Sequence, residues 1–347
     1  MRKSIKLLFM LFVLFLLAAC GSNDASSENE GNNSGQGGNL TVYSAYPEEH
    51  AMEAMNQFTE ATGIEVEMIR MSAGEILAKV RAEKNNPQAD IWYGSAADTF
   101  VAAKEEDLLQ AYQSPEAEAI PEQYRDSEGY WTGVYIGAIG FATNKHFLEE
   151  NGLDAPASWD DLLDPAYKSD IVMGHPNSSG VAYTTLDSII RAKGGEEEGF
   201  EYMNDLDEQI QQYTTSGGAP GRMVGLNEAG AGILLAYDIV KYIEEGYDDI
   251  ILSFPEEGTG YEIGSVGIIN DAPNAELAEQ FVDWAVSPEA QEVGQTANNF
   301  HNLTHPDASE PEQAADLDSI NLIESDPVEA GGRRQEIVER WDNEVNN

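Results

Sequence analysis

Short strand and helix patterns alternate along the chain from residue 40, and this alternation constrains the fold most. Apolar or alternating runs at 40–44, 64–69 and 89–93 predict strands, and apolar residues at helical spacing in 47–62 and 76–84 predict helices between them. The predicted strands start about 25 residues apart, which leaves room for a crossover helix between successive parallel strands. The sequence therefore predicts an α/β fold built on a parallel sheet.

The same alternation returns in a second region, at about residues 140–262. The expected strands and helices of this region and of the segment that follows it lie at 171–173, 181–193, 199–207, 218–226, 232–236, 264–269, 275–286 and 333–345. Two α/β lobes of this kind place ligands at the carboxyl ends of their strands, and a cleft between lobes is the usual position of a ligand.

The start of the chain is typical of a secretory signal. Basic residues at 2 and 3 precede an apolar stretch at about 7–17 and the small residues before Cys20. The apolar stretch is shorter than the roughly 20 residues that a membrane-spanning helix needs, which argues against a transmembrane anchor. Because the segment ends on cysteine, it resembles a bacterial lipoprotein signal. The resemblance implies cleavage after residues 1–19 and a lipid on Cys20 that anchors the protein at the extracytoplasmic face of the membrane.

Cys20 is the only cysteine of the chain, so no disulfide is expected and the fold depends on its core alone. The segment that follows, 20–39, consists mainly of Gly, Ser, Asn and acidic residues. Such a composition cannot build a core and predicts a flexible linker between the lipid and the folded part.

Acidic residues dominate the charge of the chain. There are 63 Asp and Glu against 18 Lys and Arg, a formal net charge of −45, and the acids are spread along the sequence. This balance excludes nucleic-acid binding, which needs a basic surface. It predicts a solvated acidic coat, which suits a protein that faces high external salt.

Four segments rich in small and hydroxyl side chains lie where a predicted strand passes into a predicted helix. They contain Ser44, Ala45 and Tyr46; Ser72 and Ala73; Asn177, Ser178, Ser179 and Gly180; and Thr215, Ser216 and Gly217. The first turn of a helix offers unpaired N–H groups and a partial positive charge, serine and threonine add hydroxyl donors, and glycine lets a ligand approach the backbone. Helix capping alone explains any one segment, but the four together predict a cradle for an anion that needs no lysine.

Two carboxylates stand apart from the acidic runs. Asp238 follows the predicted strand at 232–236, and Glu262 ends the segment Gly-Thr-Gly-Tyr-Glu at 258–262. Carboxylates among small and aromatic residues accept hydrogen bonds from ligand hydroxyls or bind a cation. The alternative for each is a surface acid or a helix cap.

Three longer motifs carry a specific resemblance to a known family. They are Pro-Asn-Ser-Ser-Gly-Val-Ala-Tyr-Thr at 176–184, Tyr-Thr-Thr-Ser-Gly-Gly-Ala-Pro at 213–220 and Glu-Gly-Thr-Gly-Tyr-Glu-Ile-Gly-Ser at 257–265. In this order they resemble the solute-binding proteins of ABC importers in the ferric-ion/sugar-phosphate group, over residues 40 to about 293. The resemblance implies the type II periplasmic-binding fold, with two α/β lobes, two crossover strands and an interlobe cleft that closes on its ligand.

The resemblance also implies an organisation and a set of partners. Lobe 1 is expected at 40–139 plus 266–347, and lobe 2 at 140–265. The implied partners are a small anionic solute and the transmembrane subunits of an ABC permease. The chain is expected to act as a monomer without a cofactor.

In the sugar-phosphate members of the group, loops rich in Ser and Thr hold phosphate, and a His-Asp pair and a glutamate hold sugar hydroxyls. Asp238 and Glu262 match the acidic positions, and Tyr237 stands where those members have the histidine. Gly94 and Ser95 begin a segment that is less glycine-rich than the corresponding family loop. The resemblance therefore implies a sugar phosphate or a related organophosphate as ligand.

Ferric ion is the alternative ligand, because ferric binders of the group use adjacent tyrosines as phenolate ligands. The matching step here is Tyr237-Asp238, which supplies one of the two phenolates. The histidines show no pair at helical i, i+4 spacing that would indicate a metal site, and they are His50, His146, His175, His301 and His305. The last two, among Asn, Pro and Thr, are expected in a surface loop.

Two further classes are weighed against solute binding. An enzyme needs a nucleophile with a base or two carboxylates beside a bond, so the one remaining enzyme hypothesis is a secreted hydrolase that uses Asp238 and Glu262. A purely structural surface lipoprotein would explain the anchor and the charge. It would not explain four polar loops at the predicted ends of strands.

Overall fold

The computed structural model describes residues 39–345. The predicted signal at 1–19, the lipidated Cys20 and nearly all of the predicted linker at 20–39 lie outside the described residues. Within the described range, no helix is both long and apolar enough to cross a membrane.

The first half of the sheet confirms the predicted alternation of strands and helices. Three parallel strands have β1 in the middle and are β1 (Asn39–Ser44), β2 (Glu65–Arg70) and β3 (Ile91–Ala96). The helices that follow them in the chain are α1 (Glu48–Thr62), α2 (Ala73–Ala82) and α3 (Ala97–Glu105). Gly63 ends α1 with a left-handed backbone, and the predicted capping box of Ser72 and Glu75 opens α2.

The second half of the sheet contains the predicted elements at 171–173, 181–193, 199–207, 218–226 and 232–236, and also elements at 145–151, 210–214, 236–244 and 250–253 that the sequence did not predict. Its strands are β6 (Ile171–Gly174), β7 (Ile210–Thr214), β8 (Ala231–Leu235) and β9 (Ile250–Ser253), with β6 parallel to both β7 and β8. Its helices are α4 (Lys145–Asn151), α5 (Gly180–Ala192), α6 (Glu196–Asp207), α7 (Ala219–Gly225) and α8 (Ala236–Glu244).

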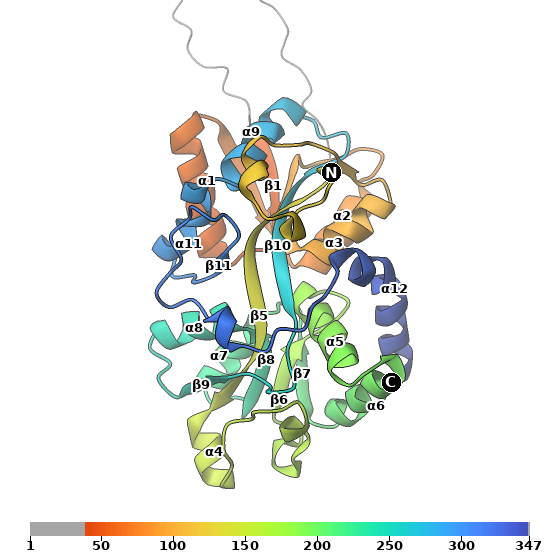
Figure 1. Cartoon of the computed structure of the whole chain (residues 1–347), viewed down its shortest axis with the longest axis vertical. Coiled ribbons are helices and arrows are strands. Elements are labelled where there is room, and N and C mark those ends of the chain that lie inside the picture. Colours follow the sequence, from red (N-terminus) through yellow and green to blue (C-terminus); the bar gives the residue numbers. More distant parts are fainter. Residues whose placement is uncertain (1–38, 346–347) are drawn as a thin grey trace, which may run out of the picture. The chain divides into compact units, whose positions relative to one another are not determined.

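Two long strands join the halves, as Figure 1 shows: β5 (Thr132–Asn144) and β10 (Tyr261–Ile269). They pair antiparallel with each other, and β10 pairs with β3 in the first half while β5 pairs with β8 and β9 in the second. The strand order is therefore β2-β1-β3-β10-β5-β8-β6-β7. The lobe boundaries expected from the sequence, at 139/140 and 265/266, fall inside these two strands.

Shorter elements and the C-terminal helices complete the described fold. The short strands are β4 (Leu109–Gln110) and β11 (Asn302–Leu303). The remaining α-helices are α9 (Ala275–Ala285), α10 (Pro288–Gln291), α11 (Val293–Thr296) and α12 (Pro327–Glu344). Single 3-10 turns lie at Glu116–Ala119, Glu122–Tyr124, Asp160–Leu163, Pro165–Tyr167 and Leu317–Ser319.

The third strand continues beyond the point where the sequence predicts its end. Gly94 has a φ of 82° and lies at a shift in the register between β3 and β10, so the strand bulges there and resumes through Ser95 and Ala96. A Cβ at Gly94 would lie 2.2 Å from the ring of Tyr46. The glycine therefore marks a bulge with a close ring contact and not the end of the strand.

Helix α12 begins six residues before the predicted start at residue 333. Asp326 caps the helix by accepting a hydrogen bond from the N–H of Val328, and Pro327 occupies the first turn. The prediction failed because Gly331 and Gly332 have low helix propensity. A Cβ at Gly331 would lie 2.6 Å from the carbonyl oxygen of Asp98, so this glycine lets α12 pack closely on α3.

The C-terminal helix contacts both halves of the fold. Arg334 forms a buried ion pair with Asp98 of α3, Nη1 to Oδ2 at 2.6 Å. On the other side, Arg333 pairs with Asp187 of α5 and Arg340 pairs with Glu196 of α6. Helix α12 thus packs against both halves and links α3 to α5 and α6.

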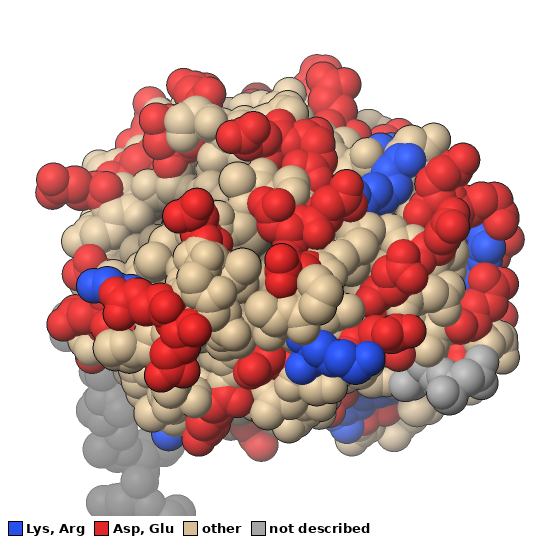
Figure 2. All heavy atoms as spheres, turned by 90° about the horizontal axis from the view of Figure 1, so that it is seen from below, with Lys and Arg blue, Asp and Glu red and all other residues tan. Residues whose placement is uncertain are grey.

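The predicted acidic coat is visible on the surface. Figure 2 shows one face of the protein, over which Asp and Glu side chains are widely distributed and Lys and Arg side chains are few. Charges of one sign that are spread in this way keep a protein soluble without marking a particular site.

Candidate functional site

A cavity of about 950 Å³ lies between the two halves of the fold, at the ends of several strands. Most of the residues that the sequence singled out line it: Ala45, Ser72, Ala73, Gly94, Ser95, Ser179, Gly180, Ser216, Gly217, Tyr237, Asp238 and Glu262. They come from both halves and from segments more than 200 residues apart in the chain. The fold therefore brings the polar loops and the two carboxylates into one place.

Two of the polar loops begin helices and meet across the cavity edge. Ser72 opens α2, and Ser179 opens α5 by accepting a hydrogen bond from the N–H of Ala182. The N–H of Gly74 donates to the carbonyl oxygen of Ser178 at 2.9 Å, which joins the first half to the second. First-turn N–H groups and hydroxyls thus face the same space from two helices, an arrangement that suits an anion.

Five of the predicted ligand residues do not line the cavity. They are Ser44, Tyr46, Asn177, Ser178 and Thr215. The amide of Asn177 donates to the Asp342 carboxylate of α12 at 2.7 Å, and the Ser178 hydroxyl donates to the carbonyl oxygens of residues 175 and 215. Sequence patterns identify the loops but do not show which of their side chains turn inward.

The two carboxylates are buried and face the cavity. Burial raises the pKa of Asp238 to about 6, against the opposing effect of Lys241 and Arg70. Burial also raises the pKa of Glu262 to about 8, although a hydrogen bond from Tyr135 opposes the rise. Such carboxyl groups are poised to exchange hydrogen bonds with ligand hydroxyls, because both donor and acceptor forms are accessible near neutral pH.

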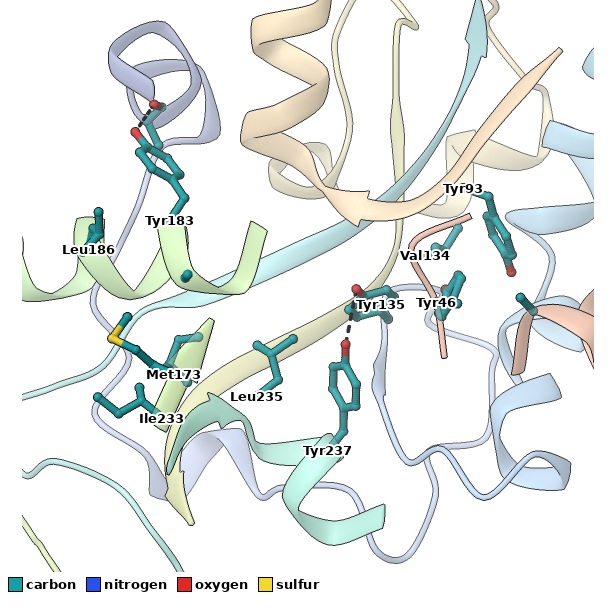
Figure 3. Packing of buried hydrophobic residues seen from close by; sticks show 14 of the residues in the cluster. Tyr46, Tyr93, Val134, Tyr135, Met173, Tyr183, Leu186, Ile233, Leu235 and Tyr237 are labelled. Carbon is teal, nitrogen blue, oxygen red and sulfur yellow. Dashed lines mark hydrogen bonds between the residues drawn. The ribbon is translucent and has the colours of Figure 1, made fainter. Parts of the chain in front are cut away.

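Two phenols lie beside Glu262. The Tyr135 hydroxyl donates to Oε1 of Glu262 at 2.6 Å. Figure 3 shows Tyr237 pointing toward Tyr135, and their hydroxyl oxygens lie 3.4 Å apart. Tyr135 comes from β5 and lines the cavity, yet the sequence analysis did not select it. Most residues of its strand are apolar, so a tyrosine there is more simply interpreted as a core residue.

Three cationic side chains line the same cavity: Arg70, Arg222 and Lys241. The predicted cradle of small and hydroxyl side chains therefore shares its cavity with positive charges that the sequence analysis did not select. Arg70 ends β2 and its Nε donates to the carbonyl oxygen of Tyr46, while Lys241 lies one turn after Asp238 on α8. A helix after the predicted strand at 232–236 would have placed Lys241 one turn from Asp238, but nothing local indicates that Arg70 points into the cavity.

Lys241 also makes a second contact between the halves, because its Nζ lies 3.4 Å from the carboxylate of Glu49 at the start of α1. The Gly74 to Ser178 hydrogen bond is the other contact described above. These two polar contacts join the halves beside the cavity.

The expected surface position of His301 and His305 is wrong. His301 is 1% exposed and stacks on Tyr135 with ring centroids 4.3 Å apart, and His305 is also buried. His50 lies 5.2 Å from His301 and stacks on Tyr46. The rings form an aromatic cluster behind the cavity wall, assembled from segments some 250 residues apart. Within the described residues, no group of three His, Cys, Asp or Glu could hold a metal ion.

The chain belongs to the bacterial extracellular solute-binding proteins, because the model of that family matches residues 86–319. It is a two-lobe binding protein of the ABC-importer type, and its place is outside the cytoplasm. The resemblance and the fold class inferred from the sequence are confirmed. Proteins of this class bind solutes and are not enzymes.

Solved and curated relatives agree with this assignment. The periplasmic binding protein AfuA from Actinobacillus pleuropneumoniae, solved with exogenous fructose-6-phosphate bound, is 34% identical, covers 90% of this chain and 99% of its own, and has a TM-score of 0.87. A protein of Haemophilus influenzae is 34% identical over 89% of this chain and 91% of its own length. The probable ABC transporter periplasmic-binding protein y4fP of Sinorhizobium fredii is 27% identical over 71% and 68%.

Proposed function

We propose that this chain is a lipid-anchored binding protein that captures a sugar phosphate or a related organophosphate by closure of its cleft and delivers it to an ABC permease. The observation that carries the proposal is the division of the cavity wall into hydrogen-bond donors and acceptors. The serine loops with Arg70 and Lys241 suit a phosphate, and Asp238 and Glu262 suit sugar hydroxyls.

The cations support an anionic ligand because two of them lack an acidic partner. Among the described residues most Lys and Arg side chains form ion pairs, whereas Arg70, Arg125, Lys145 and Arg222 do not. Arg70 and Arg222 are also the two arginines that line the cavity. In a chain with 63 acidic residues, an unpaired arginine in a cavity is available for a ligand anion.

The relatives point the same way. AfuA, 34% identical over nearly its whole length, was solved with fructose-6-phosphate. A shared fold alone does not show that two proteins bind the same ligand. The combination with unpaired arginines and buried carboxylates in this chain supports a phosphorylated solute.

Ferric ion remains the competing ligand because of one observation. Tyr135 and Tyr237 place two phenols 3.4 Å apart beside Glu262, a set of oxygen donors that suits a hard cation. Against it, burial raises the pKa of both phenols well above the usual value, and Arg70 and Lys241 line the same cavity. Nearby positive charge disfavours a bound cation, so we prefer the organophosphate.

A hydrolase that uses Asp238 and Glu262 is the remaining alternative. The family of this chain binds solutes, and Glu262 already accepts a hydrogen bond from the Tyr135 hydroxyl. We propose that the chain releases its ligand chemically unchanged. Recovery of intact sugar phosphate after prolonged incubation with the protein supports this, and release of free phosphate would contradict it.

The substitution Arg70→Gln tests the phosphate side of the site. Calorimetry with a hexose 6-phosphate is expected to show a loss of about 1.5 to 3 kcal/mol, roughly 10- to 150-fold in affinity, because one charge-assisted hydrogen bond is lost. Lys145→Gln on α4 is the matched control, since it removes one positive charge outside the cavity. Equal affinities for both variants would place the phosphate elsewhere.

The lipid anchor is tested by Cys20→Ala. Without the thiol no diacylglycerol can be attached, so fractionation of cells is expected to show an uncleaved precursor or a soluble protein. The parent protein, by contrast, is expected in the membrane fraction. A processed Cys20→Ala protein that still sediments with the membrane would contradict the anchor.

A further inference from the structure

The wall of the cavity continues along α7 and α8, past the serine loops. Arg222, Met223 and Leu226 of the α7 segment and Tyr242 and Tyr247 of the α8 segment line this part, which we call the outer wall. Leu226 is eight residues beyond Gly218, or about 12 Å along a helix at 1.5 Å per residue. The outer wall therefore extends about two helical turns past the serine loops.

Close helix packing fixes the outer wall. A Cβ at Gly221 would lie 2.5 Å from the ring of Tyr242, and one at Gly225 would lie 2.6 Å from the ring of Tyr247. The two glycines are one turn apart on α7, so each ring rests directly on the helix backbone. The Tyr242 hydroxyl also donates to the carbonyl oxygen of Gly218 at 3.2 Å. The rings are thus held in place before any ligand arrives.

Arg222 supplies a positive charge to the outer wall, and this charge is separate from that of the inner site. Arg222 lies on α7, one turn beyond Gly218, whereas Arg70 ends β2 and Lys241 lies on α8. The cations that line the cavity therefore come from three separate elements. We call Arg70 and Lys241 the inner cations and Arg222 the outer cation.

The carboxylates that line the cavity form no ion pair with Arg222. Glu48, Glu49, Glu228 and Glu245 also line the cavity. Lys241 pairs with Glu49 at 3.4 Å and with Glu245 at 3.8 Å, whereas Arg222 forms no ion pair among the described residues. An exposed guanidinium that stays unpaired beside carboxylates is available for an anion from outside.

We propose that the outer wall binds a second anionic group of the solute, so that the preferred ligand is an organophosphate with an anionic group at each end, such as a sugar bisphosphate. This inference rests on the proposed function, because it assigns the first phosphate to the serine loops and Arg70. Arg222 binds the second anionic group. Tyr242 and Tyr247 flank the part of the ligand that lies between its two anionic groups.

Calorimetry of the full mature chain with fructose 6-phosphate and fructose 1,6-bisphosphate tests the inference. The bisphosphate is expected to bind about tenfold or more tightly than the monophosphate, since one charge-assisted contact is added. Arg222→Gln is expected to remove this preference, so that the bisphosphate and the monophosphate bind the variant with equal affinity. Lys145→Gln, which changes the charge equally outside the cavity, is expected to keep the preference.

The outcomes separate this inference from the proposed function. If the monophosphate binds and the bisphosphate binds no more tightly, the outer anion site is wrong and the proposed function stands. A preference that survives Arg222→Gln also overturns the role of Arg222. If neither compound binds, the proposed function itself fails.

Discussion

Replacement of Arg334 by alanine is expected to destabilise the fold by about 3 to 5 kcal/mol, because it leaves Asp98 buried without its partner. The pair is nearly inaccessible to water, with 7% and 9% of the two side chains exposed. Burial raises the pKa of Asp98, and the charge of Arg334 opposes that rise. The guanidinium also lies 4.4 Å from the ring centroid of Tyr183, so the variant loses a second contact.

Denaturant unfolding of the mature protein measures this effect. Lys168→Ala is the control, since it breaks an exposed pair with Glu208 whose contribution is expected to be below about 1 kcal/mol. A loss below about 1 kcal/mol for Arg334→Ala would contradict the view that α12 is fixed to α3 by a buried ion pair.

The second large effect is a dependence of stability on pH that comes from Glu262. Its pKa is about 8 in the folded protein against an ordinary value of 4.5, so between these pH values the folded state holds the proton more tightly than the unfolded state. Stability from this group is therefore present at low pH and is lost as pH rises toward 8. The full difference is about 4 to 5 kcal/mol.

Glu262→Gln isolates this contribution because glutamine carries no titrating proton. The free energy of unfolding of the variant, minus that of the parent, is expected to rise by about 4 kcal/mol between pH 5 and pH 9 without ligand. His50 acts in the opposite direction in both proteins: burial lowers its pKa to about 3, so stability is lost as pH falls below about 6.5. Its effect cancels in the difference. A difference that does not change with pH would show that Glu262 is ionised in the folded state.

The strands, helices and polar loops could be predicted because their signals are local. Period-two and helical spacings identified β1, β2, α1 and α5 to within about two residues. The Ser-Gly segments at 72–74 and 178–180 identified two helix starts that line the cavity. Such patterns depend on a few neighbouring residues, so the sequence alone is sufficient for them.

The cations and the histidines could not be predicted because their roles depend on distant partners. Arg70 faces a cavity whose far wall lies more than 100 residues away in the chain. His301 is buried only because Tyr46, Tyr135 and Tyr237 surround it. A polar context around His301 therefore predicted a surface loop, although the fold covers it with aromatic rings.

The measurement that tests the central claim most directly is calorimetric titration of the mature parent protein with a hexose 6-phosphate, the unphosphorylated hexose and ferric citrate. The account predicts saturable binding of the hexose phosphate at one site per chain, with the unphosphorylated hexose at least about 100-fold weaker because the contacts to phosphate are missing. Tight binding of ferric ion with a visible phenolate-to-iron absorption band, and no binding of the hexose phosphate, would contradict it.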